Sequence, residues 1–397
     1  MKILLLNDLG APHGGAELLT LSLRAGLRDR GHDARLFASS AASDAGPNEA
    51  DYTCFGTMSG LRTVNRVINP SAPLRLHQAL RAFRPDVVHV RMFMSQLSPL
   101  ILPLLRRVPA LYHATWNETI CPTGLKMLPD GAVCYQAAGT VCMSNGCVSR
   151  RAWAPLMLQL QLWRRWRDSF DLIVANSGSI RTRLLEHGIG PVEVLWNGVP
   201  VVTARPPLIG PPTVTCAGRL SWEKGLDVLI RAFATVVAAV PDAQLLLAGS
   251  GPEREPLHRL IRDLRLESHV RLLGQLALPE LEQAFRGGWV HAVPSRVAES
   301  FGLTAAEAMM RGTAVVASAE GGLAEITIDG DTGLLVPAGD AAALSRALVR
   351  LLTDRELAER MGRQARAHAL VTMNRERWID SFVAFYRRLA SDRPATM

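Results

Sequence analysis

Two carboxylates stand eight positions apart in the stretch "ESFGLTAAEAMMRG", which begins at Glu299. The apolar run before it predicts a buried strand, and its second half predicts a helix that begins near Thr304. The first N–H groups of such a helix, at Gly302, Leu303 and Thr304, would lie unpaired at its positive end, where a phosphate binds. Glu307 would accept hydrogen bonds from a neighbouring diol such as a ribose, although capping and surface charge are commoner roles for a Glu pair.

A pair of cations precedes this stretch in "GRLSWEKG", where Arg219 follows a predicted strand and Lys224 precedes a predicted helix. Both cations are expected at the same edge of a sheet, which indicates a diphosphate ligand. Arg offers a planar fork and Lys a point charge, and both stabilise negative charge that develops on a leaving group. Ordinary surface charges are the alternative interpretation.

Two further candidates come from the first half of the chain. The motif "HGGAE", His13 to Glu17, follows the first predicted strand, and Gly15 would let a ligand approach the backbone where a helix starts. The motif lacks the G-x-G-x-x-G spacing of a dinucleotide site, which argues against an NAD-dependent enzyme. His113, in "LYHATW", follows another strand and is predicted to face a ligand cleft, with a hydrogen-bonded structural histidine as the alternative.

These candidates require parallel sheets, and the sequence contains two series of short apolar runs that alternate with helix-period segments. The first series is "KILLLN", "DARLFA", "DVVHV", "PALYHA" and "DLIVAN", and the second is "TVTCAGRL", "AQLLLAG", "HVRLLG", "WVHAVPS", "AVVAS" and "TGLLVP". We predict an α/β fold of two Rossmann-like, doubly wound domains that face an interdomain cleft. The proline-rich segment 197–212 is predicted to connect them, with the boundary near residue 205.

The domain prediction assigns residues 1–204 to the first domain, 205–375 to the second and 376–397 to a terminal helix. At 397 residues, 48% of them hydrophobic and 20% charged, the chain is long enough to fold around two cores. In the terminal helix, Trp378, Phe382 and Tyr386 recur at a four-residue spacing. This aromatic face needs a partner, and we expect the helix to pack across the domain junction.

A resemblance to a known family rests on several motifs in the second half of the chain. They are "GRLSWEKGLDVLI", "LAGSGPE", "VPSRVAESFGLTAAEAMMRGTAVVAS", "GGLAEI" and "DTGLLV", in this order, together with the earlier "GGAE" and "NGV". The set strongly resembles the retaining glycosyltransferases of family 4, which have the GT-B fold. The resemblance covers most of the chain, and it implies an acceptor-binding first domain and a second domain that binds a nucleotide-sugar donor.

The resemblance also implies a role for each candidate in the second half. Glu299 would contact hydroxyls of the donor sugar, and Glu307 would hold the nucleotide ribose. Arg219 and Lys224 would grip the donor diphosphate. Such enzymes transfer the sugar with retention, without a protein nucleophile or a required divalent metal, so these two cations would supply the positive charge that a metal provides elsewhere.

In the first half the resemblance is looser. Gly15 is similar to the glycine whose backbone approaches the phosphates, and His113 is similar in place to a histidine near the transferred sugar. Ala114 stands where many members have Asp, which changes the hydrogen-bond setting of His113.

Four of the six cysteines lie in one insertion, residues 121–147, which a minimal member of this family lacks. They are Cys121, Cys134, Cys142 and Cys147, at intervals without the C-x-x-C signature of common zinc sites. Structural zinc, free thiols and redox pairing are three open interpretations. Because the insertion follows His113, a metal-stapled loop here would shape the acceptor pocket.

A possible membrane contact is indicated by the segment 153–170, "WAPLMLQLQLWRRWRDSF", which combines aromatic, aliphatic and arginine residues at helical spacing. This composition is typical of an interfacial helix, and an ordinary Rossmann helix with a solvated arginine face is the alternative. The apolar stretch in the start "MKILLLNDLG" is too short for the core of a signal peptide. No apolar run in the sequence approaches the roughly 20 residues of a membrane-spanning helix. We predict a cytoplasmic protein, with peripheral attachment at the inner face of the cell membrane as an open variant.

The predicted function is transfer of a hexose-type sugar from a UDP- or GDP-sugar to a glycan, lipid-linked or small-molecule acceptor, without a catalytic cofactor. A GT-B epimerase or phosphorylase is the rival among enzymes, although no lysine is marked as a phosphorylase cofactor site. A non-catalytic, two-lobed sugar-binding protein is the rival from another class, and Arg219 with Lys224 argues against it. No nucleic-acid partner is expected, because no basic-aromatic module accompanies the modest net charge of +8.

Overall fold

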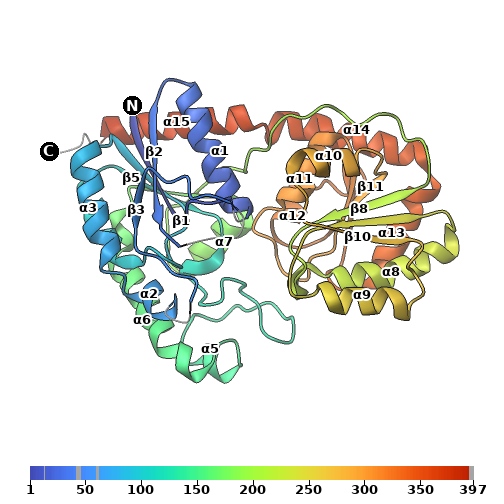
Figure 1. Cartoon of the computed structure of the whole chain (residues 1–397), viewed down its shortest axis with the longest axis horizontal. Coiled ribbons are helices and arrows are strands. Elements are labelled where there is room, and N and C mark those ends of the chain that lie inside the picture. The colour runs from blue at the N-terminus through green and yellow to red at the C-terminus, as the bar shows by residue number, and fades with distance from the viewer. Residues whose placement is uncertain (13, 42–45, 60–61, 393–397) are drawn as a thin grey trace. The chain divides into compact units, whose positions relative to one another are not determined.

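Two α/β units make up the chain, and each has its own parallel sheet. The computed structural model describes residues 1–12, 14–41, 46–59 and 62–392, and Figure 1 shows their helices and strands. The first unit comprises Met1–Leu195 together with the terminal segment that begins at Glu376. The second unit comprises Trp196–Arg375.

The first unit contains a seven-stranded sheet in the order β3-β2-β1-β4-β5-β6-β7, in which neighbouring strands pair in parallel. Its strands are β1 (Lys2–Leu9), β2 (Asp33–Ser39), β3 (Tyr52–Cys54), β4 (Val87–Val90), β5 (Ala110–Ala114), β6 (Leu172–Ala175) and β7 (Glu193–Val194). The sequence predicts all of them except β3 and β7, which are too short to show an apolar period. The strand order reverses between β1 and β4, the position at which open α/β sheets bind ligands.

Helices cover both faces of this sheet. They are α1 (Gly15–Asp29), α2 (Arg62–Val67), α3 (Ser71–Phe83), α4 (Leu102–Leu105), α5 (Val141–Ser144), α6 (Arg150–Trp166), α7 (Gly178–Glu186) and α15 (Arg375–Asp392). One face of the sheet packs into a core with α3, α6 and α7. The terminal helix α15 packs against the opposite face, where its Trp378, Phe382 and Tyr386 are at most 2% exposed. The aromatic face expected from the four-residue spacing therefore has its partner in this sheet.

The second unit contains a six-stranded parallel sheet in the order β10-β9-β8-β11-β12-β13. Its strands are β8 (Thr213–Ala217), β9 (Gln244–Ala248), β10 (Val270–Gly274), β11 (Val290–Val293), β12 (Ala314–Ser318) and β13 (Gly333–Val336). Its helices are α8 (Leu226–Ala239), α9 (Arg254–Asp263), α10 (Leu278–Phe285), α11 (Leu303–Arg311), α12 (Gly321–Ile326), α13 (Ala341–Thr353) and α14 (Arg355–Thr372). The strand order reverses between β8 and β11, so the loops after these two strands flank the switch point.

The proline-rich segment 197–212 belongs to the second unit. It has no regular secondary structure, as its composition predicts, but its backbone is anchored. Val199 N donates to Met373 O at 2.8 Å, and Arg205 N donates to Arg311 O at 2.8 Å. The N-terminal part of the first unit ends at Leu195, before the segment predicted as the connection.

The helix α6 directs its aromatic residues inward. Trp163 is fully buried, Trp166 packs against the same core, and Trp153 Nε1 donates to Gly139 O at 2.9 Å. This arrangement is that of an ordinary Rossmann helix, with Trp163 in the core and Arg164 and Arg165 exposed. A membrane contact through 153–170 stays a prediction. In the described residues, no helix combines the length and the apolar composition needed to cross a bilayer.

Candidate active site

The centre of the site is an ion pair between Lys224 and Glu299. Lys224 lies in the loop after β8 and Glu299 in the loop after β11, so the switch point brings them together. Lys224 Nζ lies 2.6 Å from Glu299 Oε1, and the buried Ser295 Oγ donates to the same oxygen at 2.5 Å. Burial alone would raise the pKa of Glu299, but the Lys224 ammonium and the two hydrogen bonds outweigh it and hold the pKa below its ordinary value. Glu299 is therefore an ionised acceptor at neutral pH.

The second cation, Arg219, lies at the start of the β8–α8 loop and is 64% exposed. Its Nη2 donates to Glu223 Oε1 at 2.5 Å, and its Nε donates to Ser221 Oγ at 3.3 Å. Burial would raise the pKa of Glu223, but hydrogen bonds from Ser221 and the Arg219 charge bring it below its ordinary value. Both predicted diphosphate-binding cations thus lie in one loop, each held by a carboxylate and each with further N–H donors available.

The loops after β8 and β11 are fastened to each other. Arg296 makes a bidentate pair with Asp227, at 2.5 and 2.7 Å, and Arg296 N donates to Glu223 O at 2.9 Å. Gly225 has a left-handed backbone, with φ 66°, and a Cβ there would lie 2.1 Å from Pro294 O. Only glycine permits this approach, which fixes the distance between the two loops.

The predicted anion-binding helix end is present as the start of α11. Gly302 caps the helix in a left-handed conformation, with φ 100°, and its carbonyl accepts the N–H of Ala306 at 3.1 Å. The N–H groups of Leu303 and Thr304 belong to the first turn and have no acceptor within the helix. They lie at the positive end of the helix dipole, immediately after the loop that carries Glu299.

Glu307 lies one turn further into α11. Burial raises its pKa to about 7; the Arg311 charge lowers it and the Glu282 charge raises it. Arg311 cannot act as a full counterion, because its guanidinium is bonded to Glu282 at 2.7 and 2.9 Å. The Glu307 carboxyl group therefore lacks a dedicated partner within the described residues, as a group reserved for a ligand would.

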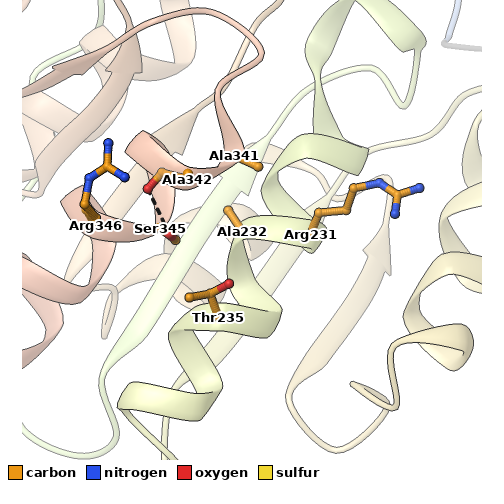
Figure 2. Close-up of a pocket in the computed structure, with 7 residues that line it drawn as sticks. All are labelled: Arg231, Ala232, Thr235, Ala341, Ala342, Ser345 and Arg346. Atoms are coloured by element: carbon orange, nitrogen blue, oxygen red, sulfur yellow. Dashed lines mark hydrogen bonds between the residues drawn. The ribbon is translucent and has the colours of Figure 1, made fainter.

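A surface pocket of about 440 Å³ lies elsewhere in the second unit, between α8 and α13. Figure 2 shows Arg231 of α8 and Arg346 of α13 on opposite sides of it. The walls between them carry small side chains, namely Ala232, Thr235, Ala341, Ala342 and Ser345. Because no polar groups converge in it, this pocket lacks the features of the site around Glu299.

His113 lies in the interior of the first unit. It is fully buried on β5, where its ring lies 5.0 Å from the Phe382 ring and 5.5 Å from the His89 ring. Burial, and the nearby charge of Arg91, lower its pKa well below the ordinary value. Side chains alternate along a strand, and the His113 side of β5 faces α15. A place for His113 near the transferred sugar stays a prediction.

The "HGGAE" motif stands where the sequence indicates, after β1. Gly15 is the first residue of α1, and the Gly14 carbonyl accepts the N–H of Leu18 at 3.0 Å. Gly14 itself is extended, so this turn is open backbone rather than a strained conformation. His13 lies outside the described residues.

The four cysteines of the insertion occupy one neighbourhood. Burial raises the pKa of Cys147, and the charges of Cys142, Cys121 and Cys134 raise it further. All of the cysteines are free, and no group of three or more His, Cys, Asp or Glu residues in the described ranges is arranged to hold a metal ion. Free thiols, structural zinc and redox pairing stay open as interpretations of this cluster.

Comparison with known families covers nearly the whole chain in two parts. Residues 13–202 match the family described as Glycosyltransferase Family 4, and residues 207–368 match Glycosyl transferases group 1. The chain belongs to glycosyltransferase family 4. This confirms the resemblance inferred from the motifs between "GRLSWEKG" and "DTGLLV".

Two relatives illustrate this family 4 membership. Glycogen synthase of Mycobacterium tuberculosis is 30% identical over 293 residues, which are 72% of this chain and 64% of that protein. Phosphatidyl-myo-inositol mannosyltransferase of Mycobacterium leprae is 38% identical over 207 residues, which are 50% of this chain and 54% of that protein. The matched regions thus span less than two thirds of either relative.

Among solved structures, HepE of Anabaena, in complex with UDP and glucose, superposes with a TM-score of 0.72. The match covers 98% of this chain and 100% of that chain at 22% sequence identity. At this identity the likeness shows a shared fold. With its two parallel-sheet units, this family 4 chain has the GT-B fold, as predicted.

Two features of the family 4 site were missed in the sequence. Ser295 gives no signal because a lone Ser before a loop is common, yet it is fully buried and bonded to Glu299. The motif "GGLAEI" contributes its glycines as packing partners of the Glu299 loop: Gly322 N donates to Glu299 O at 2.7 Å. A Cβ on Gly321 would lie 2.4 Å from Glu299 O, and one on Gly322 would lie 2.5 Å from Phe301 Cα. Two adjacent glycines after a buried strand are the signal that could have found them.

Proposed function

We propose that this chain is a retaining glycosyltransferase that moves a hexose-type sugar from a UDP- or GDP-sugar to a glycan, lipid-linked or small-molecule acceptor. The observation that carries the proposal is the contact of Lys224 with the ionised Glu299, immediately before the amide-rich start of α11. It combines a cation for a diphosphate, a carboxylate for hydroxyl groups and a helix end for phosphate within one pair of loops.

The donor would be held in three parts. Arg219, Lys224 and the N–H groups of Leu303 and Thr304 would bind the diphosphate. Glu307 would accept hydrogen bonds from the ribose.

Glu299 would orient the sugar. Its Oε1 accepts from both Lys224 and Ser295, and its Oε2 has no hydrogen-bond partner among the described residues. Oε2 is therefore the atom available to sugar hydroxyl groups.

The chemistry follows from the charge distribution. As the bond between the sugar and the diphosphate breaks, negative charge grows on the leaving phosphate, and Arg219 and Lys224 would stabilise it. No divalent metal is needed for this step in the proposal. Glu299 is held by Lys224 and Ser295, so it would orient hydroxyl groups rather than attack the anomeric carbon. Retention without a covalent enzyme intermediate then requires that the acceptor hydroxyl attack the anomeric carbon from the face that the diphosphate leaves, through an oxocarbenium-like transition state.

The names of relatives and neighbours support a sugar-nucleotide reaction. Glycogen synthase and a phosphatidyl-myo-inositol mannosyltransferase are matched in sequence, and the Anabaena neighbour was crystallised with UDP and glucose. The first two differ in acceptor, a glucan and a phospholipid by their names, so the acceptor of this chain stays a choice among the three classes. The proposal places the enzyme in the cytoplasm with its donor, at the inner face of the cell membrane if the acceptor is lipid-linked.

The test has two steps. A thermal-shift screen of the purified chain against UDP-, GDP- and ADP-sugars identifies the donor, because a ligand that binds only the folded state raises its stability. Donor turnover with and without candidate acceptors, followed by the anomeric configuration of the product, then tests transfer and retention. Failure of every nucleotide sugar to stabilise the chain, or an inverted product, would contradict the proposal.

A further inference from the structure

An exposed apolar surface lies on the first unit between β3 and the first turn of α3. We call it the apolar patch, and its members are Phe55, Met58, Val64, Ile68 and Leu74, each between 45% and 61% exposed. Sixteen large apolar side chains are exposed in the described parts of the chain, and five of them fall within these 20 residues. Isolated apolar residues on a surface need no explanation, but such a concentration indicates a contact surface.

A buried polar cluster fixes the position of the patch. Asn65 Nδ2 donates to Gln96 Oε1 at 3.2 Å, and Asn69 Nδ2 donates to Gln96 O at 2.7 Å. All three residues are at most 6% exposed. Because Asn65 and Asn69 are one turn apart and point inward, Val64 and Ile68, which precede them by one position, form an outward pair. The outward face of this turn is thus apolar although the core does not use it.

The other patch residues are attached to the same scaffold. Phe55 N donates to Ser71 Oγ at 3.0 Å, which places Phe55 beside the start of α3, and Leu74 lies one turn further along that helix. Met58 Sδ lies 3.8 Å from Gln96 Nε2. The patch is therefore a built surface rather than a set of unrelated side chains.

The surroundings of the patch are basic. Residues 52–85 contain five Arg and neither Asp nor Glu, and residues 131–167 likewise contain five Arg and no acidic residue. The second stretch includes α6, which packs against α2 (Figure 1). Gln159 Nε2 of α6 donates to the Arg66 carbonyl of α2 at 2.7 Å. In the first stretch, Arg75 is the neighbour of Leu74 in α3, and both Arg75 and Arg81 are exposed.

We propose that the apolar patch docks on an anionic lipid surface. Apolar side chains would enter the boundary between headgroups and acyl chains, while the arginines around them would contact negative headgroups. Two long stretches without an acidic residue are complementary to a continuous negative surface, such as that of anionic lipids. The contact concerns a surface outside the proposed donor site and does not depend on the transfer reaction.

The test is co-sedimentation of the full chain with vesicles, in the absence of donor and acceptor. We expect binding to vesicles that contain phosphatidylglycerol, little binding to phosphatidylcholine alone, and loss of binding at high salt. The double variant Val64→Gln/Ile68→Gln should reduce the partition coefficient about tenfold or more, since two apolar side chains no longer enter the lipid. The matched control is Leu185→Gln/Val371→Gln, which changes residues that are 45% and 63% exposed outside the patch and should leave binding unchanged.

A second measurement uses the unaltered chain. Hydrogen exchange of the α2 backbone should slow on phosphatidylglycerol vesicles, while that of α7 should not. No binding of the unaltered chain to these vesicles, or equal losses in the patch and control variants, would overturn the proposal. A concentration-dependent dimer that the patch variant abolishes would overturn it in favour of a second copy of the chain.

Discussion

The affinity of the chain for its donor should depend on pH through Glu307. With a pKa of about 7, this carboxyl group is about 9% ionised at pH 6 and about 91% ionised at pH 8. If the ionised form accepts the ribose hydroxyls, the dissociation constant for the nucleotide sugar should fall about tenfold from pH 6 to pH 8. Glu307→Gln removes the titration, so the variant should bind weakly and equally at both pH values.

The assay is calorimetric titration with an intact nucleotide sugar such as UDP-glucose, or the one that the thermal-shift screen selects. An intact nucleotide sugar is preferred to the free nucleotide because its diphosphate diester does not titrate between pH 6 and pH 8. A flat profile in the unaltered chain, or the same slope in Glu307→Gln, would refute the assignment of Glu307 to the ribose.

The same group predicts an opposite trend in stability. Because folding raises the pKa of Glu307 from 4.5 to about 7, the folded state holds the proton more tightly than the unfolded state. Its contribution to stability is complete below pH 4.5 and is lost as the pH rises through about 7. At pH 8, Glu307→Gln should therefore raise the free energy of unfolding by up to about 3 kcal/mol, with no gain at pH 4. Urea denaturation of the two proteins at both pH values measures this, and a variant less stable at pH 8 would show that Glu307 has a structural partner.

Three other predictions concern the rest of the site. Lys224→Met and Glu299→Gln should each lower kcat about 100-fold. A double-mutant cycle of the two substitutions, measured by urea unfolding, should give a coupling energy of about 2 kcal/mol, because the pair is mostly buried. Additive losses of stability would mean that the 2.6 Å contact does not stabilise the fold. Gly322→Ala should destabilise the second unit by about 1–3 kcal/mol and lower the rate of sugar transfer, since the new Cβ would press on the Phe301 backbone. A variant with the melting temperature and transfer rate of the unaltered chain would show that Gly322 does not hold the Glu299 loop. Prolonged treatment with EDTA should leave transfer unchanged, and recovery of a lost activity by Mg²⁺ or Mn²⁺ would show that the two cations do not suffice.

The sequence predicted where Lys224, Glu299 and the start of α11 lie in the second unit, for a local reason. In a buried parallel sheet each strand is a short apolar run, so the residues that follow it lie at the ligand-binding edge whatever the details of packing. Lys224 and Glu299 were placed at that edge from the runs before them, and the structure brings them into contact. The start of α11 was placed within one residue, because Gly302 is both the cap and the end of the loop.

For His113, the same reasoning does not determine which face of the sheet the side chain occupies. The strand was identified correctly, but the period of two gives both faces of a doubly covered strand the same apolar signal. The face of β5 that carries His113 is covered by α15, a helix more than 250 positions later in the chain. The partner of Trp378, Phe382 and Tyr386 was invisible for the same reason.

The sequence by itself determined the family, the alternation of strands and helices, and the loops that carry the charged residues, because these depend on neighbours within about ten positions. The tertiary structure alone decided which side chains those loops bring together: Ser295 under Glu299, and Gly321 and Gly322 against the backbone that carries it. It also decided that Val64 and Ile68 are exposed while Trp163 of α6 is buried. Apolar residues carry the same signal in a core and on a docking surface, and only the packing of distant segments distinguishes the two.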